Sequence, residues 1–189
     1  MQLSHLKNTF TKDIKTVEEL TECLVGSPLC DFPKIIRKAQ LSLEELHSFA
    51  TWKLNDYTRN CLTRNEKFEL ILLCWDSGVH TPIHDHGGKD CWIYQLQGSI
   101  DEVRFEKTGQ HLTESNRIKI QAGGLSFIND KMGYHAIQNN SEQRAMSLHI
   151  YASPIDSCMV FNKETACFEE KSMSYNSYKD ESVDLALNV

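Results

Sequence analysis

Two histidines separated by a single residue stand near the middle of the chain, in the run Pro82-Ile83-His84-Asp85-His86-Gly87-Gly88. Residues two apart in a strand point to the same face, so this spacing predicts two imidazoles side by side. Such a pair is a metal site if further ligands join it, and otherwise a pair of surface or hydrogen-bonding histidines. The spacing alone leaves both open. Asp85 is expected to point to the opposite face, with no metal role.

Glycines and a third histidine extend the pair into a longer pattern. Its members are Gly78, His84, His86, Gly98, Gly124, His135 and Asn139. The order G-x5-H-x-H, a later G, and then G followed by H-x3-N resembles the cupin barrel over roughly residues 67–151. Two positions depart from that pattern. The usual acidic ligand falls at Asp90 or Cys91, and the turn usually written P-x-G is Asp130-Lys131-Met132.

A closer resemblance rests on several short motifs in a fixed order. They are Tyr57-Thr58-Arg59-Asn60, Cys74-Trp75, Ile83–His86, Cys91, Gly98, His135 and Ser147–Tyr151. Together they resemble the thiol dioxygenases of the cysteine dioxygenase type, over about residues 56–158. Each motif is weak alone, and the set is specific. The resemblance implies a mainly β fold: a single cupin-type β-barrel (double-stranded β-helix or jelly roll) with an N-terminal helical segment.

The resemblance also implies a reaction and a metal. His84, His86 and His135 would bind one Fe(II) per chain, and both atoms of O2 would pass to the thiol of L-cysteine. The product would be cysteine sulfinic acid, in cysteine catabolism and taurine or sulfur metabolism. Three neutral imidazoles leave the metal's other positions open and bring no negative charge, which favours a thiolate ligand. Three histidines equally suit catalytic zinc with a bound water.

Arg59 matches the family residue that clamps the substrate carboxylate, and Tyr57 lies two residues before it in the matching run. A guanidinium offers a planar fork suited to a carboxylate. The resemblance therefore implies that both residues bind the substrate.

Cys91 and Tyr151 match the positions that form a thioether cross-link beside the iron in this family. Ser147 and His149 match a hydrogen-bond relay to the tyrosine hydroxyl, and alternation on one strand makes them face the same way as Tyr151. These four are the predicted catalytic residues. The family's Ser-Pro-Pro run, which contains a cis peptide, corresponds here to Ala152-Ser153-Pro154, where the first proline is missing.

Two other functions stay open. One is dioxygenation of another small carboxylate-bearing thiol, such as 3-mercaptopropionate, which Arg59 would also accept. The other is a non-catalytic cupin that only binds a ligand. Storage cupins usually contain two barrels and a sensor needs an effector domain, so the length favours the enzyme.

The elements that must position these residues change character along the chain. Capping-box spacing at Thr16–Glu19 and Ser42–Glu45 predicts helices in the first third, the second with an apolar spacing from Leu43 to Leu54. Pro28 and Pro33 are expected in the connection between these two helical segments. From about residue 57, short apolar runs alternate with turn residues, which is typical of a sandwich or barrel. The predicted strands are 67–75, 92–96, 100–105, 117–121, 125–128, 134–138, 145–151, 159–161 and 166–169.

Length and composition agree with one domain. The chain has 189 residues and a formal net charge of −6, which disfavours nucleic acid and anionic membranes as partners. Seven cysteines without a C-x-x-C pair argue against a disulfide framework or a zinc ribbon. We expect one domain over 1–189, divided into helices (1–56), barrel (57–170) and a tail (171–189) that either wraps the barrel or is loose. We expect a cytoplasmic monomer whose partners are L-cysteine and O2.

Overall fold

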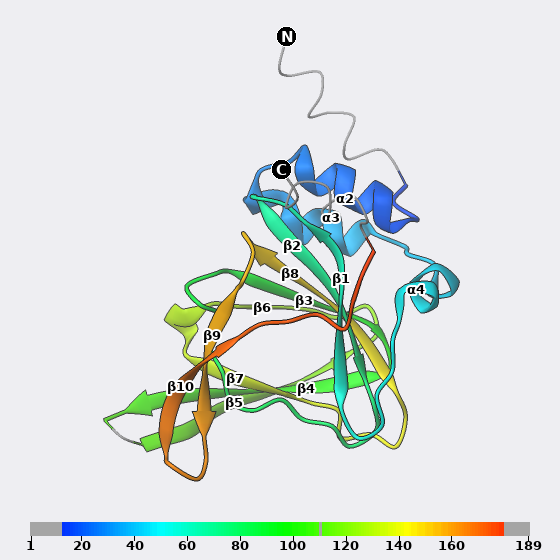
Figure 1. The fold of residues 1–189 in the computed structure, drawn as a ribbon. Coiled ribbons are helices and arrows are strands. Elements are labelled where there is room, and N and C mark those ends of the chain that lie inside the picture. The colour runs from blue at the N-terminus through cyan, green and yellow to red at the C-terminus, as the bar shows by residue number, and fades with distance from the viewer. Residues whose placement is uncertain (1–12, 110, 180–189) are drawn as a thin grey trace, which may run out of the picture. The chain divides into compact units, whose positions relative to one another are not determined.

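The computed structural model describes residues 13–109 and 111–179, which form two compact units, 13–49 and 50–179 (Figure 1). Parts of the predicted helical segment (1–12) and of the predicted tail (180–189) lie outside the described residues. The single domain with its three divisions stays a prediction. No helix in the described ranges is long and apolar enough to cross a membrane.

The first unit contains α2 (Val17–Val25), the short 3-10 turn η1 (Leu29–Asp31), α3 (Phe32–Lys38) and α4 (Leu43–Phe49). The capping box predicted at Thr16 is confirmed. The Glu19 N–H donates to Thr16 Oγ1 at 3.1 Å, and the Glu19 carboxylate accepts from the Thr16 N–H at 3.3 Å. The apolar face behind this cap is buried, with Leu20 and Leu24 at zero exposure.

Two features of this unit differ from the sequence expectation. Pro33 lies in the first turn of α3 rather than in a link, because the first turn of a helix tolerates a residue without an N–H. The apolar spacing from Leu43 does not continue as helix: α4 ends at Phe49, and Leu54 is 77% exposed. Glu45, the acidic residue of the capping box predicted at Ser42, has a distant partner: its carboxylate accepts from the N–H of Val17 at 3.1 Å.

The second unit consists of three sheets (Figure 1). The first has the order β11-β1-β2-β8-β3-β6, the second is the hairpin β10-β9, and the third has the order β5-β4-β7. The strands are β1 (Tyr57–Arg64), β2 (Phe68–Trp75), β3 (Cys91–Gln97), β4 (Ser99–Thr108), β5 (His111–Gln121), β6 (Leu125–Ile128), β7 (Tyr134–Gln138), β8 (Ala145–Ala152), β9 (Ser157–Asn162), β10 (Cys167–Ser172) and β11 (Ser177–Tyr178). The 3-10 turn η2 (Asp130–Met132) precedes β7.

All nine predicted strands coincide with observed strands, β2 to β10. β5 begins at His111, before the predicted start at residue 117. The sequence prediction missed its first half because that half is mostly exposed and polar and shows no apolar alternation. β1 and β11 were not among the predicted strands. β11 pairs in parallel with β1, so the tail does lie along the barrel as far as the described residues extend.

The core lies between the six-stranded and three-stranded sheets. It draws Ile71 and Leu73 from β2, Ile93 from β3, Ile100 from β4 and Ile137 from β7. Every residue of β2 is buried, which its apolar run Leu70–Trp75 predicts for all but Glu69. The mainly β, cupin-type jelly roll expected from the sequence is therefore confirmed. Its chemistry-bearing residues lie on the strands that enclose this interior.

Candidate functional site

A cavity of about 450 Å³ lies on the interior side of the large sheet. β1, β2 and β8 supply its inner wall, and the loop after β2, the β9–β10 hairpin and the segment after it supply the rest. Six predicted or suspected site residues line it: Tyr57, Arg59, Trp75, His84, His149 and Tyr151. His86, His135, Cys91 and Ser147 are buried behind these residues.

The two neighbouring histidines lie in the loop between β2 and β3 and not on a regular strand. His84 forms an isolated antiparallel bridge with His135 of β7, in which each N–H donates to the other carbonyl at 2.9 and 3.0 Å. The N–H of His86 donates to Asp130 Oδ1 at 2.7 Å. The predicted neighbourhood is therefore correct, although backbone bridges to β7 and η2 produce it in place of strand alternation.

Glycine is required on either side of the histidine cluster. Gly87 has φ +56°, and a Cβ there would lie 2.7 Å from the carbonyl oxygen of Ser157. Gly133 has φ +93°, and a Cβ would lie 2.4 Å from the carbonyl oxygen of Phe105. Both distances are shorter than real Cβ contacts. Only glycine therefore fits in the turn after His86 and in the turn before His135.

The three histidines converge through their Nε2 atoms. The Nε2 of His135 lies 3.0 Å from that of His86 and 3.2 Å from that of His84. Burial is the main cause that lowers the pKa of His84 to about 3 and that of His135 well below its ordinary value, with the neighbouring histidines adding to the shift. Both imidazoles are therefore neutral at physiological pH and can present lone pairs to a metal ion.

Hydrogen bonds on the opposite ring nitrogens set the tautomers. The Nδ1–H of His84 donates to the carbonyl oxygen of Pro82 at 2.9 Å, and that of His135 donates to Glu102 Oε1 at 3.2 Å. Carbonyl and carboxylate oxygens only accept, so both Nε2 atoms are left without protons. Unprotonated nitrogens 3.2 Å apart repel unless a cation lies between them. This donor set therefore fits a bound metal ion.

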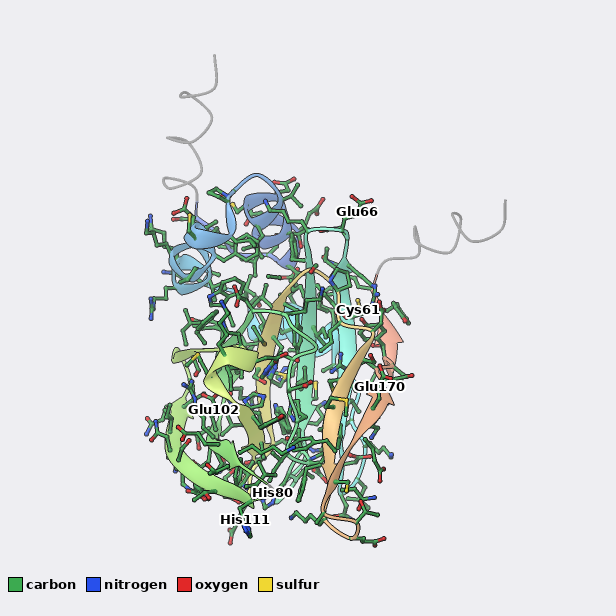
Figure 2. The ribbon with its side chains drawn as sticks, turned by 90° about the vertical axis from the view of Figure 1, so that its left-hand side faces the viewer. Cys61, Glu66, His80, Glu102, His111 and Glu170 are labelled. Carbon is green, nitrogen blue, oxygen red and sulfur yellow. The ribbon has the colours of Figure 1, made fainter. Side chains whose placement is uncertain are left out.

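Glu102 and Asp130 are site residues that the sequence reasoning missed. Glu102, on β4, is fully buried, and its Oε2 accepts from Arg104 at 3.1 Å and Ser126 at 2.5 Å (Figure 2). Asp130 Oδ1 lies 3.7 Å from Nδ1 of His86, too far for a hydrogen bond, and its carboxylate accepts from two backbone N–H groups of the histidine loop. Glu102 carried a faint signal, since it lies two residues after Ile100 and so shares the inward face of the strand.

No acidic side chain joins the histidines as a ligand in the described part of the chain. Asp90, at the usual acidic position, accepts from the side chain of Asn129 at 2.8 Å. Asp85 points away, as expected, and accepts from the N–H of Met159 at 2.9 Å. His80, which is close to His84 in sequence, does not join the cluster either: its Nε2 lies 2.8 Å from Oδ1 of Asn140.

The predicted relay residues share one face of β8. Ser147 Oγ accepts from Trp75 Nε1 at 2.9 Å and lies 3.1 Å from His149 Nε2. Burial lowers the pKa of His149 well below its ordinary value, so this ring is neutral and its Nε2 can accept from the serine hydroxyl. The rings of His149 and Tyr151 are 6.5 Å apart, and no hydrogen bond links them in the described structure.

Cys91 and Tyr151 are direct partners across β3 and β8. Burial raises the pKa of both groups, and a side-chain hydrogen bond with Tyr151 partly opposes the rise at Cys91. The thiol and the phenol are therefore adjacent and protonated, in the register that a cross-link between them requires. Close by, Ser153 has φ +63°, and no peptide bond among the described residues is cis.

Arg59 and Tyr57 lie on the same face of β1, toward the cavity. The Nε and Nη2 atoms of Arg59 are buried, and neither has a hydrogen-bond partner in the described chain. The Tyr57 ring stacks on Trp75 at 5.1 Å. A buried guanidinium with unsatisfied N–H groups beside a cavity is a site for an anion such as a carboxylate.

Comparison with known sequences gives a consistent result. A family model described as "Cysteine dioxygenase type I" matches residues 31–164. Curated proteins named "Cysteine dioxygenase type 1" from Homo sapiens and Rattus norvegicus are 30% and 31% identical over 183 residues, which is 84% of this chain and 91% of theirs. A solved cupin superfamily protein from Desulfitobacterium hafniense is 16% identical with a TM-score of 0.46, over 58% of this chain and 88% of that one.

Proposed function

Because the chain belongs to the cysteine dioxygenase type I family, we propose that it is a non-haem iron enzyme acting on L-cysteine. It adds both atoms of O2 to the thiol and produces cysteine sulfinic acid, a step of cysteine catabolism. One observation carries the proposal. His84 of the three-histidine cluster lines the same cavity as Arg59, whose Nε and Nη2 have no partner in the described chain, so one small molecule can reach both groups.

His84, His86 and His135 are the proposed iron ligands. Nitrogens ~2.1 Å from a metal lie ~3.0 Å apart at right angles and ~3.4 Å apart at tetrahedral angles. The observed separations of 3.0 and 3.2 Å fall within this range, so one metal ion could bind both pairs of nitrogens. Fe(II), when bound there, supplies open positions for the thiolate and O2 and the electrons that activate O2.

Arg59 is proposed to bind the substrate carboxylate. Its unsatisfied N–H groups would donate to the two carboxylate oxygens and recover the hydrogen bonds that burial removed. Burial is the main cause of the lowered pKa of His84, and the positive charge of Arg59 adds to it. The guanidinium is therefore near enough to His84 for their charges to interact. This contact would orient the thiol toward the histidines.

Tyr151 is proposed to place a protonated hydroxyl beside the reacting thiol. Its raised pKa keeps the phenol neutral, so it can donate a hydrogen bond. A thioether between Cys91 and the Tyr151 ring would replace an S–H and a ring C–H with a C–S bond, with O2 accepting the two hydrogens and their electrons. It would fix the hydroxyl in place, which raises rate without being essential chemistry. Burial keeps His149 neutral, and Ser147, which accepts from Trp75, holds its ring in one orientation at the cavity wall.

The test is oxygen consumption by the purified protein, reconstituted separately with Fe(II) and Zn(II). With Fe(II), we expect one equivalent of sulfinate per O2 from L-cysteine, and with Zn(II) none. 3-Mercaptopropionate tests the alternative substrate: turnover of it above that of L-cysteine would reassign the substrate. Binding of L-cysteine without oxygen consumption would indicate a non-catalytic cupin. The monomeric state and cytoplasmic location remain predictions.

A further inference from the structure

The C-terminal segment 173–178, whose course the sequence left open, runs beside Arg59. Asn176 fixes the backbone there: its N–H donates to the carbonyl oxygen of Arg59 at 2.7 Å, and its Oδ1 accepts from the Arg59 N–H at 2.9 Å. Immediately beyond, β11 pairs with β1. This segment is therefore attached to β1 at the residue proposed to bind the substrate carboxylate.

Within this segment, the ring of Tyr175 lies between two guanidinium groups. The Cζ of Arg59 is 5.6 Å from the ring centroid, and the Cζ of Arg64 is 5.9 Å from it. Arg64 Nη1 also donates to the Tyr175 hydroxyl at 2.6 Å. Tyr175 thus contacts Arg59 through its ring only, while its hydroxyl is engaged elsewhere.

Arg64 holds this ring independently of Arg59. Its Nη2 pairs with Asp156, and its Nη1 lies 3.7 Å from the buried carboxylate of Glu69. The N–H of Met173 donates to the carbonyl oxygen of Asp156 at 2.8 Å, which ties the same segment down at its start. The position of the Tyr175 ring is therefore set before any ligand enters the cavity.

We propose that Tyr175 is a positioning residue for substrate binding, which orients the Arg59 guanidinium through its ring and leaves the N–H groups free for a carboxylate. An acidic side chain in this place would also orient Arg59, but it would occupy the same N–H groups and compete with the substrate. A ring face attracts the cation without accepting its N–H groups. This explains how Nε and Nη2 of Arg59 stay unpartnered within the described structure. The inference rests on the proposed function.

The test is anaerobic calorimetry of ligand binding to the Fe(II)-loaded protein, with L-cysteine and with cysteamine, which lacks the carboxylate. Tyr175→Leu removes the ring and should raise the Kd for L-cysteine about 3- to 30-fold, with the Kd for cysteamine unchanged within about twofold. Tyr175→Phe keeps the ring and should stay within about threefold of wild type for L-cysteine. Phe161→Leu removes a ring on β9 that contacts Phe168 and does not line the cavity, and is the control.

An unchanged Kd for L-cysteine in Tyr175→Leu would overturn the inference. An equal loss for both ligands, or a loss in Phe161→Leu as large as in Tyr175→Leu, would also overturn it, because the loss would then not depend on the ring beside Arg59. If Tyr175→Leu does not fold, Tyr175→Gln takes its place in the same comparison. Carboxylate-selective binding without oxygen consumption by wild type would overturn the proposed function alone.

Discussion

Replacing Arg59 with Ala removes the one group proposed to bind the substrate carboxylate, while the histidine cluster keeps its contacts. Truncating one partner of a buried charged pair costs ~2–5 kcal/mol. Arg59 is half-buried, and of its nitrogens in the described structure only Nε and Nη2 are both buried and without a hydrogen-bond partner, so the lower part of that range applies. A loss of ~2–3 kcal/mol corresponds to a fall in kcat/KM for L-cysteine of about 30- to 150-fold.

The assay is steady-state oxygen consumption with L-cysteine and with cysteamine. Wild type should use cysteamine poorly, and Arg59→Ala should change that rate by less than about threefold, because the lost contact never formed. Arg117→Ala is the control, since Arg117 is an exposed arginine paired with Glu114 on β5. Unchanged L-cysteine kinetics in Arg59→Ala, or equal use of both thiols by wild type, would refute the carboxylate clamp.

Four further predictions follow from the site. His135→Ala should lose most bound iron, measured by metal analysis, because it removes one of the three converging nitrogens; full iron content would contradict the ligand assignment. Glu102→Gln should weaken metal affinity about 10- to 100-fold in a chelator competition, because a carboxylate behind a ligating imidazole sets its orientation and basicity; unchanged affinity would exclude that role. Cys91→Ser should lower kcat without abolishing turnover, and peptide mapping of active wild type should show a fraction linked to Tyr151; separate recovery of both peptides in every preparation would exclude the cross-link. Glu69→Gln should raise the melting temperature at pH 7 relative to wild type, with the difference closing by about pH 4.

The sign of the last prediction follows from burial. Burial raises the pKa of Glu69, so the folded state binds this proton more tightly than the unfolded state does. The stability that this group contributes is present at low pH and is lost as pH rises through the raised pKa. Glutamine stays neutral at every pH, so the variant does not lose this stability as the pH rises. It also keeps an oxygen to accept from the N–H of Ile155, which donates to Oε2 of Glu69 at 3.0 Å. A wild-type protein as stable as the variant at pH 7 would contradict the argument.

Many helices and strands could be predicted because short stretches of neighbouring residues indicate them. The apolar run Leu70–Trp75 of β2 and the capping box at Thr16 are signals that a few neighbouring residues carry. The exposed half of β5 carries no such signal, since backbone pairing with β4 defines it. β11 is two residues long and depends on a partner more than a hundred residues away, so its place could not be read from its own sequence.

The candidate site shows the same division. His84, His86 and His135 were identified by type and spacing, and the structure brings them together. The reason differs from the one expected, because a bridge to β7 aligns His84 where strand alternation was predicted. Glu102 could not be assigned from sequence, since its role depends on the β4–β7 register, which pairs it with Ile137 and leaves the His135 imidazole, two residues along, within hydrogen-bond distance. The same holds for Tyr175, which meets Arg59 only through the fold.

The central claim is that this chain transfers both atoms of O2 to the sulfur of L-cysteine. The most direct test supplies ¹⁸O2 to the Fe(II)-loaded protein with L-cysteine in ordinary water and measures the product by mass spectrometry. Transfer of both oxygen atoms predicts cysteine sulfinic acid carrying two ¹⁸O atoms. Cystine as the sole product, or a sulfinate whose second oxygen comes from water, would contradict it.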